Sequence, residues 1–248
     1  MMFWFKSKVI NIDCFTGRQY VHDFYPIDNT NKFFPDWWKA LDKSYSDESG
    51  IFPQATIKGC TGFNQFFNNG ITIPLWSEMA IGLTVNRQFG LQFADFKSAA
   101  SHHAFKQMEG YLNPNEYSHL KIQTPWLIEC KENINWMWVQ NTWGFRNPGN
   151  FIIPPGIVNY KYNSTTDINM FFSFQNLQEN LLIKEGTPMV NIVPMDDRRV
   201  KVHVHKLSEE EFMNKRERLI PTSFLNKYGT TKNLINKYES KCPFGFGK

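Results

Sequence analysis

Residues 151–163 have the sequence FIIPPGIVNYKYN, and this stretch shows how the second half of the chain is built. A Pro-Pro-Gly triplet at 154–156 separates two runs that are rich in β-branched and aromatic residues. Proline presets the φ angle of a turn and glycine tolerates unusual turn conformations, so the triplet predicts a turn. The flanking runs are then strands, one over 151–153 and one over 156–162.

The same pattern of short strands and turns continues on both sides of this stretch. Further strands are predicted at 8–15, 71–76, 79–86, 89–95, 120–123, 125–130, 134–140, 168–174, 181–184, 189–194 and 200–205. Short and regular spacing, with Pro and Gly between the strands, favours a barrel or sandwich over β-α-β units. Gly186, in the turn of IKEGTPMV, can adopt a φ angle that other residues avoid. We therefore predict a mainly β protein.

A few short helices are expected beside the strands. Pro35 stands at a favourable first position for a helix that carries Trp37 and Trp38. Ser208 and Glu211 have the spacing of a capping box, which predicts a C-terminal helix over 209–219. The segment 95–116 is predicted to be one long polar connection, and connections of this length in a compact domain are often functional or form a lid.

Length and charge limit the classes of protein that fit. A chain of 248 residues can bury one large β core, and we predict one β-rich domain over 1–220 with a C-terminal extension over 221–248 that contains a second short helix. The net charge of +4 is small and evenly spread, so nucleic acid is not an expected partner. The sequence has no signal-peptide pattern, no membrane span and no paired cysteine motif, so we expect a cytoplasmic protein with reduced thiols.

Candidate binding residues are histidine, tryptophan and amide side chains. His103 and Gln107 are four residues apart and would face each other on a helical turn. Alternation places Trp136 and Trp138 on one strand face, where stacked rings could form a wall of a pocket or part of the core. If a pocket exists, we expect these residues around it: His103, Gln107, Trp136, Trp138, Trp143 and Asn159.

A metal site is the alternative interpretation of the histidines. His203 and His205 share one strand face in VKVHVH, although Lys201 lies on that face too and would repel a cation. A metal enzyme would need His103, with some of His119, His203 and His205 and a carboxylate, to converge on one point. Because a solvated outer face explains the VKVHVH pattern better than a metal site does, we expect no metal and no cofactor.

The spacing of the Pro-Pro-Gly triplet, Asn159 and Asn163 is similar to the second motif of the cupin barrels. In those proteins a metal-binding histidine normally stands at the position of Asn159. Asparagine is a poor ligand for a transition metal, so the resemblance implies a jelly-roll or cupin-like barrel without a cupin-type metal.

Several phrases together resemble a family of uncharacterised proteins from tailed bacteriophages of marine bacteria, with bacterial relatives. They are DWWKAL, CTGFNQFFNNGITIPLW, TPWLIEC, PPGIVNYKYNSTTDIN and IKEGTPMVNIVPM, and the resemblance covers roughly residues 8–205. It implies a phage or bacterial origin and a β-rich fold, and it names no chemistry.

Three functions remain open on this sequence. The first is a non-catalytic accessory protein whose barrel binds a small ligand or a protein. The second is a metal-dependent enzyme, oxygenase-like or hydrolase-like, that uses a histidine cluster. The third is a structural component of a virion, for which the high aromatic content would suit an interface.

Overall fold

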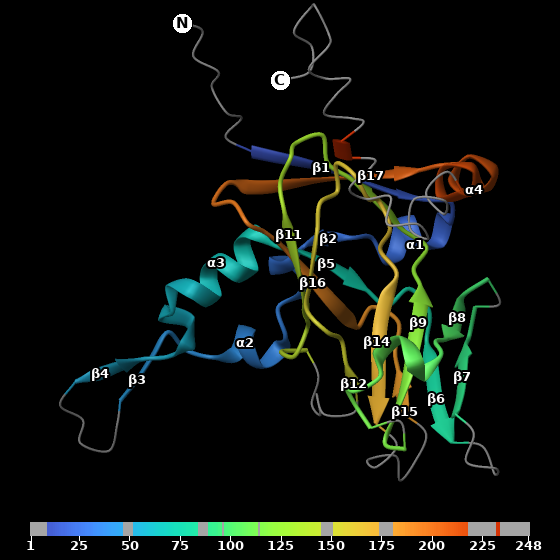
Figure 1. The fold of residues 1–248 in the computed structure, drawn as a ribbon. Helices are drawn as coiled ribbons and strands as arrows, with labels where there is room; N and C mark the ends of the chain where they lie inside the picture. Colours follow the sequence, from blue (N-terminus) through green and yellow to red (C-terminus); the bar gives the residue numbers. More distant parts are fainter. Residues whose placement is uncertain are drawn as a thin grey trace, which may run out of the picture.

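The computed structural model describes residues 9–46, 52–83, 89–95, 97–113, 115–144, 151–173, 181–217 and 232–233. Within them the protein is mainly β with a few short helices, which confirms the predicted fold class (Figure 1). The predicted extension 221–248 and its helix lie outside the described residues, apart from 232–233. Among the described residues, no helix has the length and apolar character needed to cross a membrane.

The first and last of the described strands lie side by side along one edge of the fold (Figure 1). β1 (Val9–Thr16) pairs in parallel with β17 (Arg199–Lys206) over its whole length, and antiparallel with β10 (Leu127–Glu129). Alternation in β1 points Ile10 and Ile12 into the core, where both are fully buried. The predicted opening strand is confirmed, and its parallel partner ties the two ends of the domain together.

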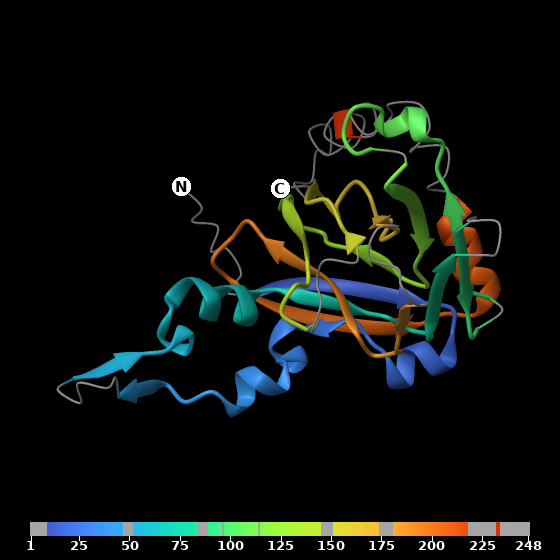
Figure 2. The same cartoon turned by 90° about the horizontal axis from the view of Figure 1, so that it is seen from below.

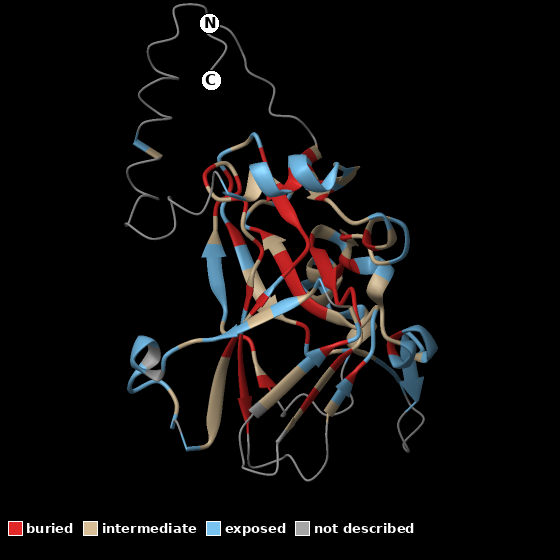
Figure 3. Ribbon diagram, turned by 90° about the vertical axis from the view of Figure 1, so that its right-hand side faces the viewer, coloured by how far each residue is buried: buried red, intermediate tan, exposed pale blue. Residues whose placement is uncertain are grey.

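The central sheet crosses the middle of the molecule and is antiparallel throughout. Its strands, in spatial order, are β13 (Gly156–Val158), β11 (Trp136–Gln140), β16 (Pro188–Pro194), β5 (Ile71–Pro74) and β2 (Asp28–Asn29). The turn before β16 contains Gly186 at φ 78°, as the sequence predicts for this position. Figure 3 shows the buried segments concentrated in the strands where the sheets face one another.

Two further sheets complete the body of the protein. One contains, in order, β12 (Phe151–Ile152), β14 (Ile168–Ser173), β9 (Tyr117–Gln123) and β8 (Ala99–His102). The other contains β15 (Leu181–Ile183), β6 (Met79–Leu83) and β7 (Phe89–Phe93), and the last two pair antiparallel. The inner face of the β14–β9 pair carries Leu120, Ile122, Met170 and Phe172, all buried. Its outer face carries His119, Lys121, Asn169 and Phe171.

The short helices lie mainly on the surface, and one pair of strands projects from the body (Figures 1 and 2). The helical elements are α1 (Gln19–Phe24), η1 (Thr30–Phe33), α2 (Asp36–Ala40), η2 (Ile57–Gly59), α3 (Thr61–Asn69), η3 (Phe105–Met108) and α4 (Glu209–Glu217). The projecting pair is β3 (Ser44–Ser46) with β4 (Pro53–Ala55). The predicted capping box at α4 is confirmed, because Glu211 N donates to Ser208 Oγ at 3.2 Å and Ser208 N donates to Glu211 Oε2 at 2.9 Å.

Two predictions of local structure are wrong. The strand expected over 156–162 ends at Val158, because Asn159 begins a turn in which its carbonyl accepts from the backbone N–H of Tyr162 and Asn163. The segment 95–116, which is predicted to be one long polar connection, instead contains β8 and η3 among its described residues. Its start is fixed by Asp95, which accepts hydrogen bonds from Tyr20 Oη at 2.9 Å and Ser98 Oγ at 3.0 Å and pairs with Arg18.

Candidate binding cleft

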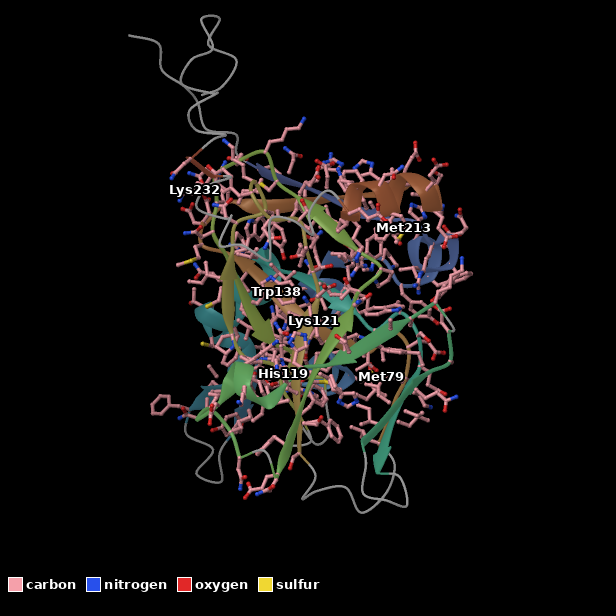
Figure 4. All side chains as sticks on the ribbon, turned by 45° about the vertical axis from the view of Figure 1, so that its right-hand side comes forward. Met79, His119, Lys121, Trp138, Met213 and Lys232 are labelled. Atoms are coloured by element: carbon pink, nitrogen blue, oxygen red, sulfur yellow. The ribbon has the colours of Figure 1, made fainter. Side chains whose placement is uncertain are left out.

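A cleft of about 560 Å³ opens on the outer face of the sheet that contains β9 and β14. The sheet supplies one wall, with His119 and Lys121 on β9 and Asn169 and Phe171 on β14. The opposite wall is built from residues 153–158 and from Trp138 of β11. Figure 4 shows His119, Lys121 and Trp138 in the same region of the molecule. We call this space the histidine cleft.

Strand register explains why polar groups meet on this wall. His119 lies directly opposite Phe171 across the two strands, and Lys121 lies opposite Asn169. Residues that alternate along a strand share a face, so the buried Leu120 leaves His119 and Lys121 pointing outward. Side chains that face each other across two strands are close enough to interact. The pairs His119–Phe171 and Lys121–Asn169 therefore form one continuous surface of the cleft.

His119 is the residue with the most unused hydrogen-bonding capacity in the cleft. Its ring stacks on Phe171 at a centroid distance of 4.5 Å with 12° between the planes. Both ring nitrogens are buried, and neither has a hydrogen-bond partner among the described residues. Buried polar atoms without partners are uncommon and costly, which makes this ring a candidate contact for a ligand.

The environment of His119 favours its neutral form. Burial lowers the pKa of the ring below its usual value of 6.5, and the charge of a protonated His103 lowers the pKa further, while the Asn169 side chain opposes the shift. The ring centroids of His103 and His119 are 4.8 Å apart. A neutral imidazole offers one donor and one acceptor, so His119 can serve a ligand group of either kind.

This shift predicts an acid-sensitive contribution to stability. The unfolded chain takes up a proton on His119 as the pH falls below 6.5, whereas the folded chain does so only at lower pH. The stabilisation is therefore complete above pH 6.5 and is lost as the pH falls from there towards the folded pKa.

We expect His119→Phe, which retains a stacked ring, to lose less free energy of unfolding between pH 7.5 and 5.5 than the parent protein. The difference should be below about 1.4 kcal/mol, because solvent screens a partly exposed ring. Urea unfolding at the two pH values measures it, and equal losses in both proteins would contradict the prediction.

Lys121 supplies the cleft with positive charge. Its Nζ lies 3.4 Å from Asp167 Oδ2, and Asp167 Oδ1 lies 2.9 Å from Arg216 Nη2 of α4. Arg216 is held further by a 3.0 Å hydrogen bond from Nη1 to the Thr124 carbonyl. Two cations thus share one carboxylate, and the surplus positive charge suits an anionic ligand group.

The predicted pair His103 and Gln107 does meet in the cleft. Gln107 lies in η3, and its Oε1 accepts a hydrogen bond from His103 Nδ1. The backbone N–H of His103 donates to the His119 carbonyl at 3.1 Å, which continues the β8–β9 ladder by one residue. Because Nδ1 is the donor in this bond, Nε2 of a neutral His103 ring is an acceptor.

Trp138 lies across the cleft from the histidines and is held in a fixed orientation. Its indole Nε1 donates to the hydroxyl of Tyr160 at 2.8 Å. Tyr160 is buried, and burial raises the pKa of its hydroxyl well above the usual value. Trp138 faces Gly156 across the β11–β13 pair, and a residue without a side chain leaves the indole open to the cleft.

The other predicted pocket residues lie elsewhere. Trp136 is fully buried, and its ring packs edge-on against Tyr160. Its strand partners Val158 and Pro194 have side chains that cover it. Trp138 stays open because its partner in β13 is Gly156. Trp143 lines a separate groove beside α3. The expectation that one pocket gathers all of these side chains is therefore wrong.

Asn159 organises turns and does not face the cleft. Its side chain is 2% exposed, and its Nδ2 donates to Asn133 Oδ1 at 2.8 Å and to Asn135 Oδ1 at 3.2 Å. Its Oδ1 accepts from the backbone N–H of Lys161 at 3.1 Å. The side chain that occupies the cupin ligand position thus joins the turn after β13 to the turn before β11.

The alternative metal set is not brought together. His203 and His205 lie on the outer face of β17, where their Nε2 atoms contact Asn11 Oδ1 at 3.0 Å and Asp13 Oδ1 at 2.7 Å. His103 belongs to a different sheet edge, in the histidine cleft. In the part of the chain that the structure describes, no three His, Cys, Asp or Glu side chains are grouped closely enough to hold a metal ion.

Four residues that dominate the cleft were not selected as binding residues from the sequence: His119, Lys121, Asn169 and Phe171. His119 was considered only as a metal ligand. The segments SHLKI and DINMFF both alternate, and each places polar or aromatic residues on the face opposite its aliphatic residues. That alternation was a usable signal, but the register that brings the two faces together is visible only in the structure.

Comparison of the sequence with protein-family models and with curated proteins suggests no function. No protein-family model matches the sequence, and no curated protein matches it. The function is therefore argued from the residues of the cleft.

Proposed function

We propose that this protein is a non-catalytic binding protein, an accessory protein of the tailed-phage type that its motifs resemble, with a jelly-roll-like or cupin-like β fold. Its ligand is an organic acid whose anionic group binds in the histidine cleft. The observation that carries the proposal is the His119 ring beside Lys121. Its buried nitrogens have no partner in hydrogen-bond geometry among the described residues, although the Asn169 side chain is near enough to raise the pKa of the ring.

The walls of the cleft suit an apolar group that carries one anionic group. Trp138, Ile157 and Phe171 provide apolar surface, and the Ile157 side chain is 66% exposed there. Lys121 provides the charge, and His119 provides a donor. Ligand sites generally combine apolar walls with a few convergent polar groups, and this cleft has that composition.

The other two functions have less support. An enzyme that uses the predicted histidine set would need ligands that the described residues do not bring together. Assembly into a larger structure is favoured by the projecting β3–β4 pair, where Tyr45 of β3 and the neighbouring Phe52 are 56% and 71% exposed. These exposed rings do not specify a partner, whereas the cleft specifies a ligand chemistry.

Calorimetric titration with benzoate and with its uncharged analogue benzamide tests the proposal. Benzoate should bind, and Lys121→Gln should weaken it about tenfold or more, which corresponds to about 1.4 kcal/mol. The same variant should change benzamide binding little. Lys201→Gln, an exposed lysine on β17, is the matched control and should leave both titrations unchanged. Absence of benzoate binding, or equal losses for the two lysine variants, would overturn the proposal.

A further inference from the structure

A second space, which we call the aromatic groove, lies beside the histidine cleft. It has a volume of about 550 Å³, and its walls include Phe63 and Phe66 of α3, Val139 and Trp143. The rings of Phe63 and Trp143 meet edge to face at 4.7 Å. No charged side chain is among the described residues that line it. The groove therefore suits a hydrocarbon group.

The aromatic groove and the histidine cleft meet at a common ridge. Ile153 and Pro155 line both spaces. The ridge is fixed by Gln140, whose Nε2 donates to the Phe151 carbonyl at 3.0 Å and whose Oε1 accepts from Ile153 N at 3.0 Å. Both ends of the Gln140 amide are thus engaged by backbone, so its presence in the groove adds little polar character. One molecule could extend over the ridge into both spaces.

From this continuity we infer that the ligand is an amphiphile, a single-chain carboxylate. Its head group binds beside Lys121 and His119, and its hydrocarbon chain crosses Pro155 into the aromatic groove. The inference rests on the proposed function, because it assigns the head group to the same cleft. It adds that the ligand class has a long apolar tail, since a compact aromatic acid would leave the aromatic groove empty.

The charge distribution supports this direction of binding. The cationic end of the combined site is at Lys121, whose partner Asp167 is shared with Arg216. At the other end, the described lining residues carry polar atoms only on Cys60, Gln140, Thr142 and the indole of Trp143, all of them uncharged. A carboxylate placed in the aromatic groove would be desolvated without a cation, whereas a methylene chain there loses only its contact with water.

The test is a titration with butyrate, octanoate and dodecanoate, each below its micelle concentration, with benzoate as the head-group probe. Affinity should rise with chain length, by up to about fourfold for each methylene that becomes buried. Thr142 is exposed and lines the aromatic groove, so Thr142→Trp should fill the groove without removing core side chains. This variant should abolish the dependence on chain length and leave benzoate binding intact.

The outcomes separate the two proposals. If benzoate binds but affinity does not rise with chain length, the amphiphile is wrong and the binding function stands. The amphiphile is also wrong if Thr142→Trp keeps the full dependence, because the chain would then lie outside the aromatic groove. If neither benzoate nor any carboxylate of the series binds, both proposals fail.

Discussion

Replacing Trp136 with alanine is expected to lower the free energy of unfolding by about 3–5 kcal/mol, the range typical of large aromatic side chains removed from a core. Trp136 is fully buried at the centre of the β13–β11–β16 pairing and packs against Tyr160. A loss of this size is a large part of the stability of an ordinary domain, so the variant should be mostly unfolded at moderate urea concentrations. Urea unfolding followed by circular dichroism gives the measurement.

Trp136→Phe is the matched control for this prediction. The indole Nε1 of Trp136 has no hydrogen-bond partner among the described residues, so phenylalanine removes volume but breaks no polar contact. We expect it to cost about 1–2 kcal/mol, well below the alanine variant. If Trp136→Ala instead folds with the stability of the parent and binds benzoate poorly, Trp136 is a ligand residue and not part of the core.

The fold class was predictable because one face of most strands is buried. In β1, apolar residues at Ile10, Ile12 and Cys14 alternate with Asn11 and Asp13, and burial of the first set follows directly. The same reasoning applies to the capping box of α4, which is a local interaction between residues three positions apart. Local patterns of this kind are encoded within a few residues.

Strand pairing was not predictable from such patterns. β1 lies parallel to β17, and the two segments are separated by most of the chain. Nothing in the alternation of either strand states its partner or direction, because register depends on the packing of the whole sheet. The end of β13 could not be predicted from alternation for a related reason. It depends on Asn159, whose side chain hydrogen-bonds to Asn133 and Asn135 in the turn before β11.

The candidate site was predictable only in part, and the reason lies in the same non-local pairing. His103 and Gln107 are close in sequence, so their contact could be anticipated from spacing. His119 and Phe171 are brought together by the register of β9 on β14. Trp136 and Trp138 do share a strand face, but the residue opposite each of them decides whether the ring is covered.

Asn159→Ala is expected to cost about 2–4 kcal/mol, the second largest effect of a single substitution considered for this protein. The side chain makes hydrogen bonds to Asn133 and Asn135 and accepts one from the Lys161 backbone, and each contributes about 1 kcal/mol. Because Asn159 is buried, water cannot replace these partners, and the groups left behind stay unsatisfied. Urea unfolding again measures the loss.

The effect should reach the histidine cleft, because the turn that Asn159 begins also places Tyr160. The Tyr160 hydroxyl accepts the hydrogen bond that orients Trp138, and its carbonyl accepts from Cys130 N at 3.2 Å. A loosened turn should therefore weaken benzoate binding even in the fraction of Asn159→Ala that remains folded.

Asn163→Ala is the matched control from the same motif, since Asn163 Oδ1 contacts only Thr165 among the described residues, at 3.0 Å to its backbone N–H and 2.8 Å to its hydroxyl. We expect this control to cost about 1 kcal/mol and to retain benzoate affinity. Equal losses of unfolding free energy in the two variants would contradict this prediction. They would show that Asn159, at the position of the cupin ligand, does not join the two turns.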